Sequence, residues 1–120
     1  ELLKTADLLV IPITFSKQQF SFVRLSMPTK FSEYLASGSP TLVYGPSGVA
    51  PIEYCKRHSI GLTQTNRSVP ELVNFLTKLK GDKASFRNRA LQDRAFAKEH
   101  LSATVMRNRF HQIIEKGLGE

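Results

Sequence analysis

The sequence predicts an α/β fold in which about three parallel strands form a sheet, with helices between the strands and after them. Three short apolar runs of strand length alternate with segments of helical periodicity. Such alternation favours a parallel sheet with right-handed crossovers. The composition is that of a globular domain, because 41% of the 120 residues are hydrophobic and 22% are charged. The length is enough for one domain, and the composition excludes a disordered or low-complexity chain.

The expected strands are the apolar runs 7–13, 41–44 and 60–63. The first run is continuously apolar, which suits a strand covered on both faces. Residues 1–6 before it have the pattern of the last turns of a helix, and residues 14–25 after it have no clean period and predict a loop. Three strands are few for a parallel sheet, and the chain opens at Glu1 inside a helical pattern. We therefore expect a single domain, 1–120, that is truncated from a longer protein.

The segment after this loop predicts a helix that begins at Pro28. Proline suits the first turn of a helix, where its missing N–H costs no hydrogen bond. Phe31, Tyr34 and Leu35 follow at helical spacing. Gly38 predicts the end of this helix, because glycine readily adopts the backbone conformation that terminates helices.

The middle of the chain predicts a turn followed by a helix. The glycines and proline of residues 45–48 favour a plain turn, and a second anion-binding nest is the alternative. The helix 50–58 is expected to face the core with Ile52 and Cys55. We interpret Cys55 as a small core residue, because no histidine is paired with it for nucleophilic chemistry. One cysteine also excludes a disulfide framework, and the three histidines lack metal-ligand spacing, so no metal site is expected.

Three helices are expected in the C-terminal part of the chain. The first opens with a capping box, in which the Ser68 hydroxyl and the Glu71 carboxylate each satisfy a backbone N–H. The second covers 83–99, and the third covers 102–116 and is expected to end at Gly117. The residues expected on one face are Leu72, Val73, Leu76 and Leu79 in the first helix, Phe86, Ala90 and Ala97 in the second, and Val105, Met106, Phe110 and Ile113 or Ile114 in the third.

The net charge of +7 is concentrated in the C-terminal third. Residues 1–77 hold seven Lys and Arg against five Asp and Glu, whereas residues 78–120 hold ten against five. Three interpretations stay open: solvated helix faces, attraction to an anionic membrane surface, and nucleic-acid binding. Nucleic acid has the least support, because the sequence contains neither a Cys/His finger nor an aromatic strand of the RNA-recognition type. No apolar stretch is long enough to span a bilayer.

The start of the helix at Pro28 is the strongest candidate for a binding site. Ligands bind at the carboxyl ends of strands in open α/β sheets, and phosphates favour helix starts. Ser26, Thr29 and Lys30 add two hydroxyls and a cation to the backbone N–H groups there. Glu33 lies one turn further on the same face as Lys30, and its carboxylate is suited to accept hydrogen bonds from the vicinal hydroxyls of a ribose. The residues predict a nucleotide clamp, and the alternative is an exposed ion pair between Lys30 and Glu33.

The segment SMPTKFSEYLASGSP, residues 26–40, resembles the signature helix of the C-terminal domain of GT-B glycosyltransferases, closest to the group 1, family 4-like members. The order of strands and helices is similar over nearly the whole chain. The resemblance implies a Rossmann-like parallel sheet that is part of that domain, and a nucleotide-sugar donor of the UDP or GDP type as ligand. It implies that Glu33 holds the ribose and that the diphosphate lies near Ser26, Met27, Pro28, Thr29 and Lys30. Many members carry a second glutamate eight positions before the first, where this chain has Leu25.

The resemblance also implies a reaction, the transfer of a sugar to an acceptor in polysaccharide or cell-envelope glycan synthesis. Such proteins need no tightly bound metal or other cofactor. Their acceptor site lies in an N-terminal domain outside this chain, so we expect the isolated chain to be inactive and assign no catalytic residue. A cytoplasmic location is expected, either free or peripheral to the membrane. The alternatives are a nucleotide-sugar epimerase of the same architecture and a non-catalytic basic module that binds nucleic acid or an anionic membrane.

Overall fold

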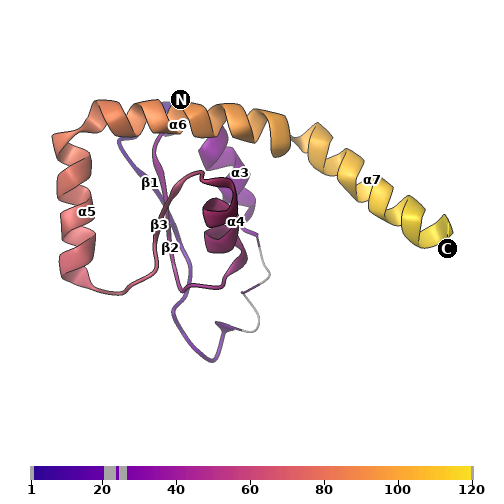
Figure 1. The fold of residues 1–120 in the computed structure, drawn as a ribbon, viewed down its shortest axis with the longest axis horizontal. Coiled ribbons are helices and arrows are strands. Elements are labelled where there is room, and N and C mark those ends of the chain that lie inside the picture. The colour runs from indigo at the N-terminus through magenta and orange to yellow at the C-terminus, as the bar shows by residue number, and fades with distance from the viewer. Residues whose placement is uncertain (1, 21–23, 25–26, 120) are drawn as a thin grey trace.

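The protein is an α/β domain built on a three-stranded parallel sheet, which confirms the fold class predicted from the sequence (Figure 1). The computed structural model describes residues 2–20, 24 and 27–119. The elements in chain order are α1 (Leu2–Thr5), β1 (Leu9–Pro12), α3 (Thr29–Ala36), β2 (Thr41–Tyr44), α4 (Ala50–His58), β3 (Leu62–Gln64), α5 (Val69–Gly81), α6 (Lys83–His100) and α7 (Ala103–Gly119).

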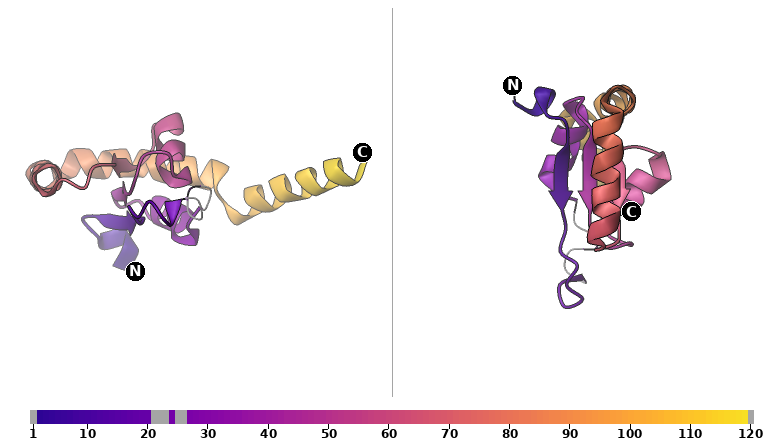
Figure 2. Two further views of the ribbon diagram at one scale, coloured as in Figure 1. Left: turned by 90° about the horizontal axis from the view of Figure 1, so that it is seen from below. Right: turned by 90° about the vertical axis from the view of Figure 1, so that its left-hand side faces the viewer.

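The sheet has the strand order β1-β2-β3, and both neighbouring pairs are parallel. Val43 of the central strand pairs with Ile11 on one side and with Thr63 on the other. Helices α3 and α4 cover one face of the sheet, and α5 stands beside the other face (Figures 1 and 2). The helices that connect consecutive parallel strands therefore lie on the same side, as right-handed crossovers require.

The core lies between the sheet and the helices α3, α4 and α6. Its buried members are Ile11, Phe31, Leu35, Val43, Val49, Ile52, Cys55, Ile60 and Ala97. The rings of Phe31 and Tyr54 meet edge to face at 5.7 Å between centroids, a favoured aromatic geometry. The burial of Ile52 and Cys55 confirms the inward face predicted for α4.

Helix α6 crosses the edge of the sheet where the strands begin. The Arg87 guanidinium donates hydrogen bonds to the carbonyls of Ala6 (3.2 Å) and Gly38 (3.4 Å). Arg89 donates to the carbonyl of Gly61 at 2.9 Å. Each of these carbonyls lies a few residues before one of the strands. Part of the basic charge in the C-terminal third therefore holds the fold together, and α6 closes the amino edge of the sheet.

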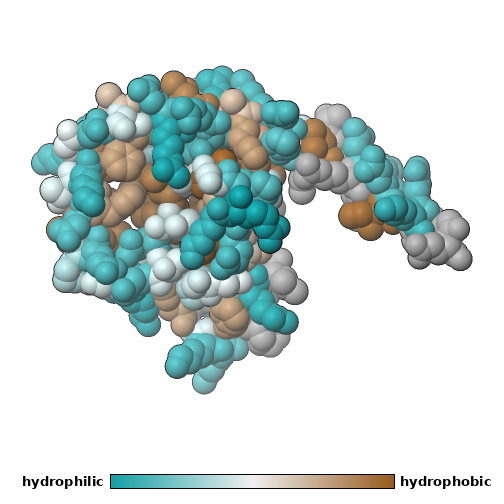
Figure 3. Space-filling view, in the orientation of Figure 1, coloured by the Kyte–Doolittle hydropathy of each residue, from teal (hydrophilic) through white to brown (hydrophobic). Residues whose placement is uncertain are grey.

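Helix α7 extends away from the body of the domain (Figures 1 and 2). Its surface is mostly polar, with hydrophobic patches between the polar side chains (Figure 3). The expected end at Gly117 is wrong, because the helix continues to Gly119. A single glycine inside a helix costs only about 1 kcal/mol relative to alanine, so it does not always terminate one.

The third strand also differs from its expected bounds. It begins at Leu62 rather than at residue 60. Ser59 and Gly61 have φ angles of 54° and 62°, which lie in the left-handed region and not in the extended region of a strand. The backbone therefore turns sharply between α4 and β3 before it becomes extended.

The face predicted for α5 is only partly buried. Leu79 is buried, but Val73 is 52% exposed and Leu76 is 42% exposed. The helix instead packs against α6 through Phe75. The ring centroids of Phe75 and Phe86 are 6.0 Å apart. The prediction therefore holds for Leu72 and Leu79, whereas Phe75 takes the inward position that periodicity assigned to Val73 and Leu76.

The capping box at the start of α5 is half formed. The Ser68 hydroxyl accepts a hydrogen bond from the backbone N–H of Glu71 at 3.4 Å, as predicted. The reciprocal bond is replaced, because the Ser68 N–H donates to the Asn66 side chain at 3.1 Å. The Glu71 carboxylate accepts from the side-chain amide of Gln64 at 3.2 Å. Glu71 therefore ties the helix to the end of β3.

Candidate functional site

The start of α3 carries no side-chain cap from any described residue. Pro28 precedes the helix and has neither an N–H nor a polar side chain. Its carbonyl accepts a hydrogen bond from the backbone N–H of Phe31 at 3.0 Å. The Phe31 N–H is therefore engaged, whereas the N–H groups of Thr29 and Lys30 have no partner among the described residues and are the amides available to an anion.

Helix α3 begins on the side of the sheet where the strands end. It leads from the carboxyl end of β1 to the first residue of β2, so it runs opposite to both strands (Figure 1). The carboxyl edge of a parallel sheet is the usual ligand-binding edge of such folds. Since α6 covers the amino edge, the start of α3 lies on the edge that α6 leaves uncovered.

Four of the predicted site residues at this helix start face solvent. Met27 is 40% exposed, and Thr29, Lys30 and Glu33 are exposed. Lys30 and Glu33 are not within ion-pair distance of each other, since no N···O contact of 4.0 Å or less joins them. The interpretation of the two residues as an ion pair is therefore wrong for this structure. Phe31 and Leu35 anchor the opposite face of the helix in the core.

Ser26 and Leu25 lie outside the described residues. The start of the site is thus described from Met27 onward. Pro28 is half-buried and adopts φ −58° and ψ 139°, the extended conformation that directs the chain into the helix.

The turn at residues 45–48 uses its amides within the fold. The Gly48 N–H donates to the Glu53 carboxylate at 2.8 Å, and the Gly45 N–H donates to the carbonyl of Gln64 at 3.2 Å. The next helix start is also occupied, because the Ala50 N–H donates to the carbonyl of Arg24 at 2.7 Å. An anion would have to displace the Glu53 carboxylate here, which favours the plain turn over the anion nest.

A pocket of about 400 Å³ lies at the carboxyl edge, lined by residues 12–16, Tyr44 and Arg67; we name it the carboxyl-edge pocket. The rings of Phe15 and Tyr44 meet edge to face at 5.2 Å, and the Arg67 guanidinium carbon lies 5.5 Å from the centre of the Phe15 ring. The Phe15 ring therefore packs against Tyr44, with the Arg67 guanidinium beside it. The sequence analysis did not identify Arg67 as a site residue, although a basic residue just after a predicted strand was a usable signal.

A second polar cluster lies at the amino edge. Asp93 of α6 is 5% exposed, and its carboxylate accepts a hydrogen bond from the Gly61 N–H at 3.0 Å. Burial raises the pKa of Asp93, against the smaller lowering effects of the Gly61 N–H and Arg89. Burial and the charge of Asp93 raise the pKa of the nearby Cys55 thiol to about 12, although Arg89 opposes them. Because these groups are engaged with the backbone of the fold, the cluster is structural.

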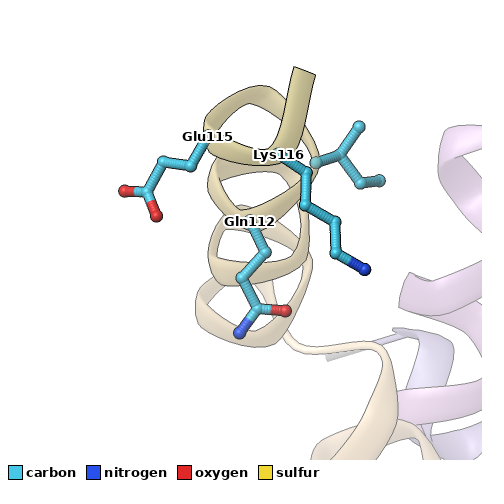
Figure 4. A pocket seen from close by; sticks show the side chains of 4 residues that line it. Gln112, Glu115 and Lys116 are labelled. Atoms are coloured by element: carbon cyan, nitrogen blue, oxygen red, sulfur yellow. The ribbon is translucent and has the colours of Figure 1, made fainter. Parts of the chain in front are cut away.

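Another hollow, of about 620 Å³, lies beside α7 and is lined by Gln112, Ile113, Glu115 and Lys116 (Figure 4). All four residues are exposed and come from this one helix. Their labelled side chains spread around the helix instead of converging (Figure 4). The hollow is therefore open surface along α7 and lacks the opposite wall of a cleft.

Among the described residues, no group of three or more His, Cys, Asp or Glu side chains is placed to hold a metal ion. Within the same part of the chain, no helix is both long and apolar enough to cross a membrane. Comparisons with family models, curated proteins and solved structures found no match for this chain.

Proposed function

We propose that the chain is the donor-binding part of a glycosyltransferase that uses a UDP- or GDP-linked sugar. The observation that carries the proposal is the start of α3, which has no side-chain cap from the described residues and presents Lys30 and Glu33 to solvent. The amides and Lys30 are suited to a diphosphate. The Glu33 carboxylate, one turn along, is suited to the two hydroxyls of a ribose. The resemblance of residues 26–40 supports the same assignment.

The reaction would exchange one bond at the anomeric carbon for another. An acceptor oxygen bonds to this carbon while the bond between the carbon and the diphosphate oxygen breaks. The nucleoside diphosphate leaves with the additional negative charge, and the N–H groups of α3 and Lys30 stabilise that charge. We assign neither the acceptor-binding site nor the group that takes the acceptor's proton to residues of this chain.

The proposal is tested by titrating UDP and GDP into the wild type and into Glu33→Gln by calorimetry. Loss of the charged acceptor is expected to weaken binding by about 1–3 kcal/mol, or roughly 5-fold to 150-fold. Glu115→Gln, an exposed carboxylate on α7, is the matched control and should bind like the wild type. Wild-type affinity of Glu33→Gln for both nucleotides, or no binding by the wild type, would contradict the proposal.

A second measurement addresses the diphosphate. Lys30→Gln is expected to weaken binding of UDP more than binding of uridine, because only UDP carries the phosphates. Lys56→Gln is the control, since Lys56 is exposed in the last turn of α4, toward the opposite edge of the sheet. Equal effects of the two substitutions would remove Lys30 from the site.

For the location of the protein, we propose association with an anionic membrane through α7. Ile113 is 69% exposed and Ile114 is 41% exposed, on a helix where Arg107 and Lys116 are also exposed. Apolar side chains with flanking cations are typical of helices that lie at a membrane surface. Co-sedimentation with phosphatidylglycerol vesicles should exceed that with phosphatidylcholine vesicles, and Ile113→Asn should reduce it. Equal sedimentation with both vesicle types would contradict the proposal.

A further inference from the structure

We propose that the carboxyl-edge pocket binds a monosaccharide that carries an anionic group, either a phosphate or a carboxylate. The proposal is independent of the nucleotide site at α3, because neither Lys30 nor Glu33 lines this pocket.

The framework of the pocket is fixed by backbone hydrogen bonds that extend the sheet beyond its strands. The Ile13 N–H donates to the carbonyl of Tyr44 at 2.7 Å, and the Gly45 N–H donates to the carbonyl of Gln64 at 3.2 Å. These bonds join the residues that follow β1 and β2 to the last residues of β2 and β3. The pocket is therefore formed by the fold without a ligand, which lowers the entropic cost of binding.

Arg67 is the cation of the pocket. Its guanidinium lies against the face of Phe15 and, within the described part of the chain, forms neither a hydrogen bond nor an ion pair. A guanidinium on an aromatic ring keeps its in-plane N–H donors available. Glu71 forms no ion pair with Arg67, and its carboxylate accepts a hydrogen bond from the Gln64 side chain instead. The group that matches these donors is a planar carboxylate or a phosphate.

The turn that carries Arg67 is also held in place. The Gln64 side chain donates to the carbonyl of Asn66 at 3.3 Å, and the Asn66 side chain accepts from the Ser68 N–H at 3.1 Å. Arg67 thus projects from a segment that is tied at both of its neighbours. This restraint positions the cation before a ligand arrives.

The rest of the lining indicates what the anionic group is attached to. Pro12, Ile13 and Phe15 contribute apolar surface, whereas Thr14, Ser16 and Tyr44 contribute hydroxyl groups. Small-ligand pockets typically combine an apolar lining with a few polar groups that fix orientation. A volume of about 400 Å³ is large enough for a single sugar ring. A sugar ring offers apolar C–H faces together with hydroxyls, and one anionic substituent pairs with Arg67.

The test is an NMR titration of the isotope-labelled full chain with four probes: glucose 1-phosphate, glucuronate, glucose and inorganic phosphate. We expect at least one anionic sugar to give saturable shifts at the backbone amides of residues 13–16 and at the Arg67 side-chain N–H. Its affinity should exceed those of glucose and of inorganic phosphate at least 10-fold. Binding of only one of the two anionic sugars would identify phosphate or carboxylate as the preferred group.

Variants separate this site from general attraction of anions to a basic protein. Arg67→Gln should lower the affinity for the bound anionic sugar at least 10-fold, and Arg67→Lys should restore part of it. Arg57→Gln removes the same charge from the last turn of α4, at the opposite edge of the sheet, and should leave the affinity unchanged. Two results would overturn the proposal: shifts no larger for the anionic sugars than for glucose, or equal effects of Arg67→Gln and Arg57→Gln. The comparison of anionic sugars with glucose needs only the wild-type chain and no variant.

Discussion

Asp93 is the buried charged residue on which the junction between α6 and β3 depends. Its carboxylate accepts from the Gly61 N–H, while Arg89 of the same helix donates to the Gly61 carbonyl. Gly61 is required in this arrangement, because its φ is positive and an added Cβ would lie 3.2 Å from the Cys55 sulfur. Both backbone groups of one glycine are therefore bound by side chains one helical turn apart.

The raised pKa of Asp93 makes the stability of the protein depend on pH. Burial raises its pKa above the usual value of 3.8, so the native state holds this proton more tightly than the unfolded state does. The stabilisation is present below that value and is lost as pH rises through the folded pKa. We expect the free energy of unfolding of Asp93→Asn, relative to the wild type, to increase from pH 3.5 to pH 7 in urea titrations. A difference that does not vary with pH would contradict this.

The Cys55 thiol is expected to be unreactive in the native protein. It is buried, and its pKa of about 12 keeps it protonated near neutral pH. Thiolate is the reactive form of cysteine. A disulfide reagent at pH 8 should label the folded chain only as fast as it unfolds, and the same chain in guanidinium should react at once. Rapid labelling of the folded chain would show that the thiol is accessible.

At the start of α5, one interaction could be predicted from neighbouring residues and another depends on the tertiary structure. Ser68 could be recognised as a cap from its own sequence neighbourhood, and the structure confirms it. The partner of Glu71 could not be predicted, because Gln64 belongs to a strand that ends before the cap. Local capping chemistry was thus predictable, whereas the competition between two possible partners of one carboxylate was not.

Substitutions at the two ends of this capping pair should differ. Ser68→Ala removes the bond to the Glu71 N–H and is expected to cost about 0.5–2 kcal/mol of stability. Glu71→Ala removes only an exposed bond to Gln64 and is expected to cost less, within about 0.5 kcal/mol. Thermal unfolding of both variants measures the difference. A larger loss for Glu71→Ala would indicate that the reciprocal cap forms after all.

Helix α6 shows why a helix can be predicted when its role cannot. Its small inward-facing residues Ala90 and Ala97 were predicted and are buried. The role of Arg87 was not predictable, since its backbone partners Ala6 and Gly38 lie far away in the sequence. The spacing of residues shows which face of a helix carries small side chains. It does not show which carbonyls, distant in the sequence, an arginine side chain will bind.

Replacing Arg87 should therefore destabilise the fold. Arg87→Met keeps much of the side-chain length and removes the donors, and we expect a loss of about 1–3 kcal/mol because hydrogen bonds to charged groups are strong. Arg107→Met, at an exposed position on α7, is the control and should change stability little. The free energy of unfolding from urea titration gives both values. Equal losses would mean that the contacts of Arg87 do not stabilise the amino edge.

At the scale of the whole molecule, the amino and carboxyl edges of the sheet differ in what covers them. The amino edge is closed by α6, whereas the carboxyl edge carries both the start of α3 and the carboxyl-edge pocket. The sequence predicted the sheet, its connections and the helix start, because each depends on neighbouring residues. It did not predict the pocket, because residues 14–16, Tyr44 and Arg67 come together only when three strands align.

Strand β1 forms one lateral edge of the sheet and is expected to favour self-association. The backbone N–H groups of Leu9 and Ile13 point toward β2, so the backbone groups of Val10 and Pro12 point away from it. Pro12 has no N–H, which suits an edge position, whereas Val10 is 45% exposed. Sedimentation should show association that grows with protein concentration, and Val10→Lys should reduce it. A wild type that stays monomeric at millimolar concentration would contradict this.

The bond from Arg87 to Ala6 spans 81 residues. Closing a segment of that length costs on the order of 4 kcal/mol of chain entropy, so this contact forms only when much of the sheet is already in place to repay it. On the ribosome, the three strands emerge well before α6 does. A nascent chain can thus pair its strands early. The carbonyls at the amino edge of the sheet stay without their α6 partners until that helix has been synthesised.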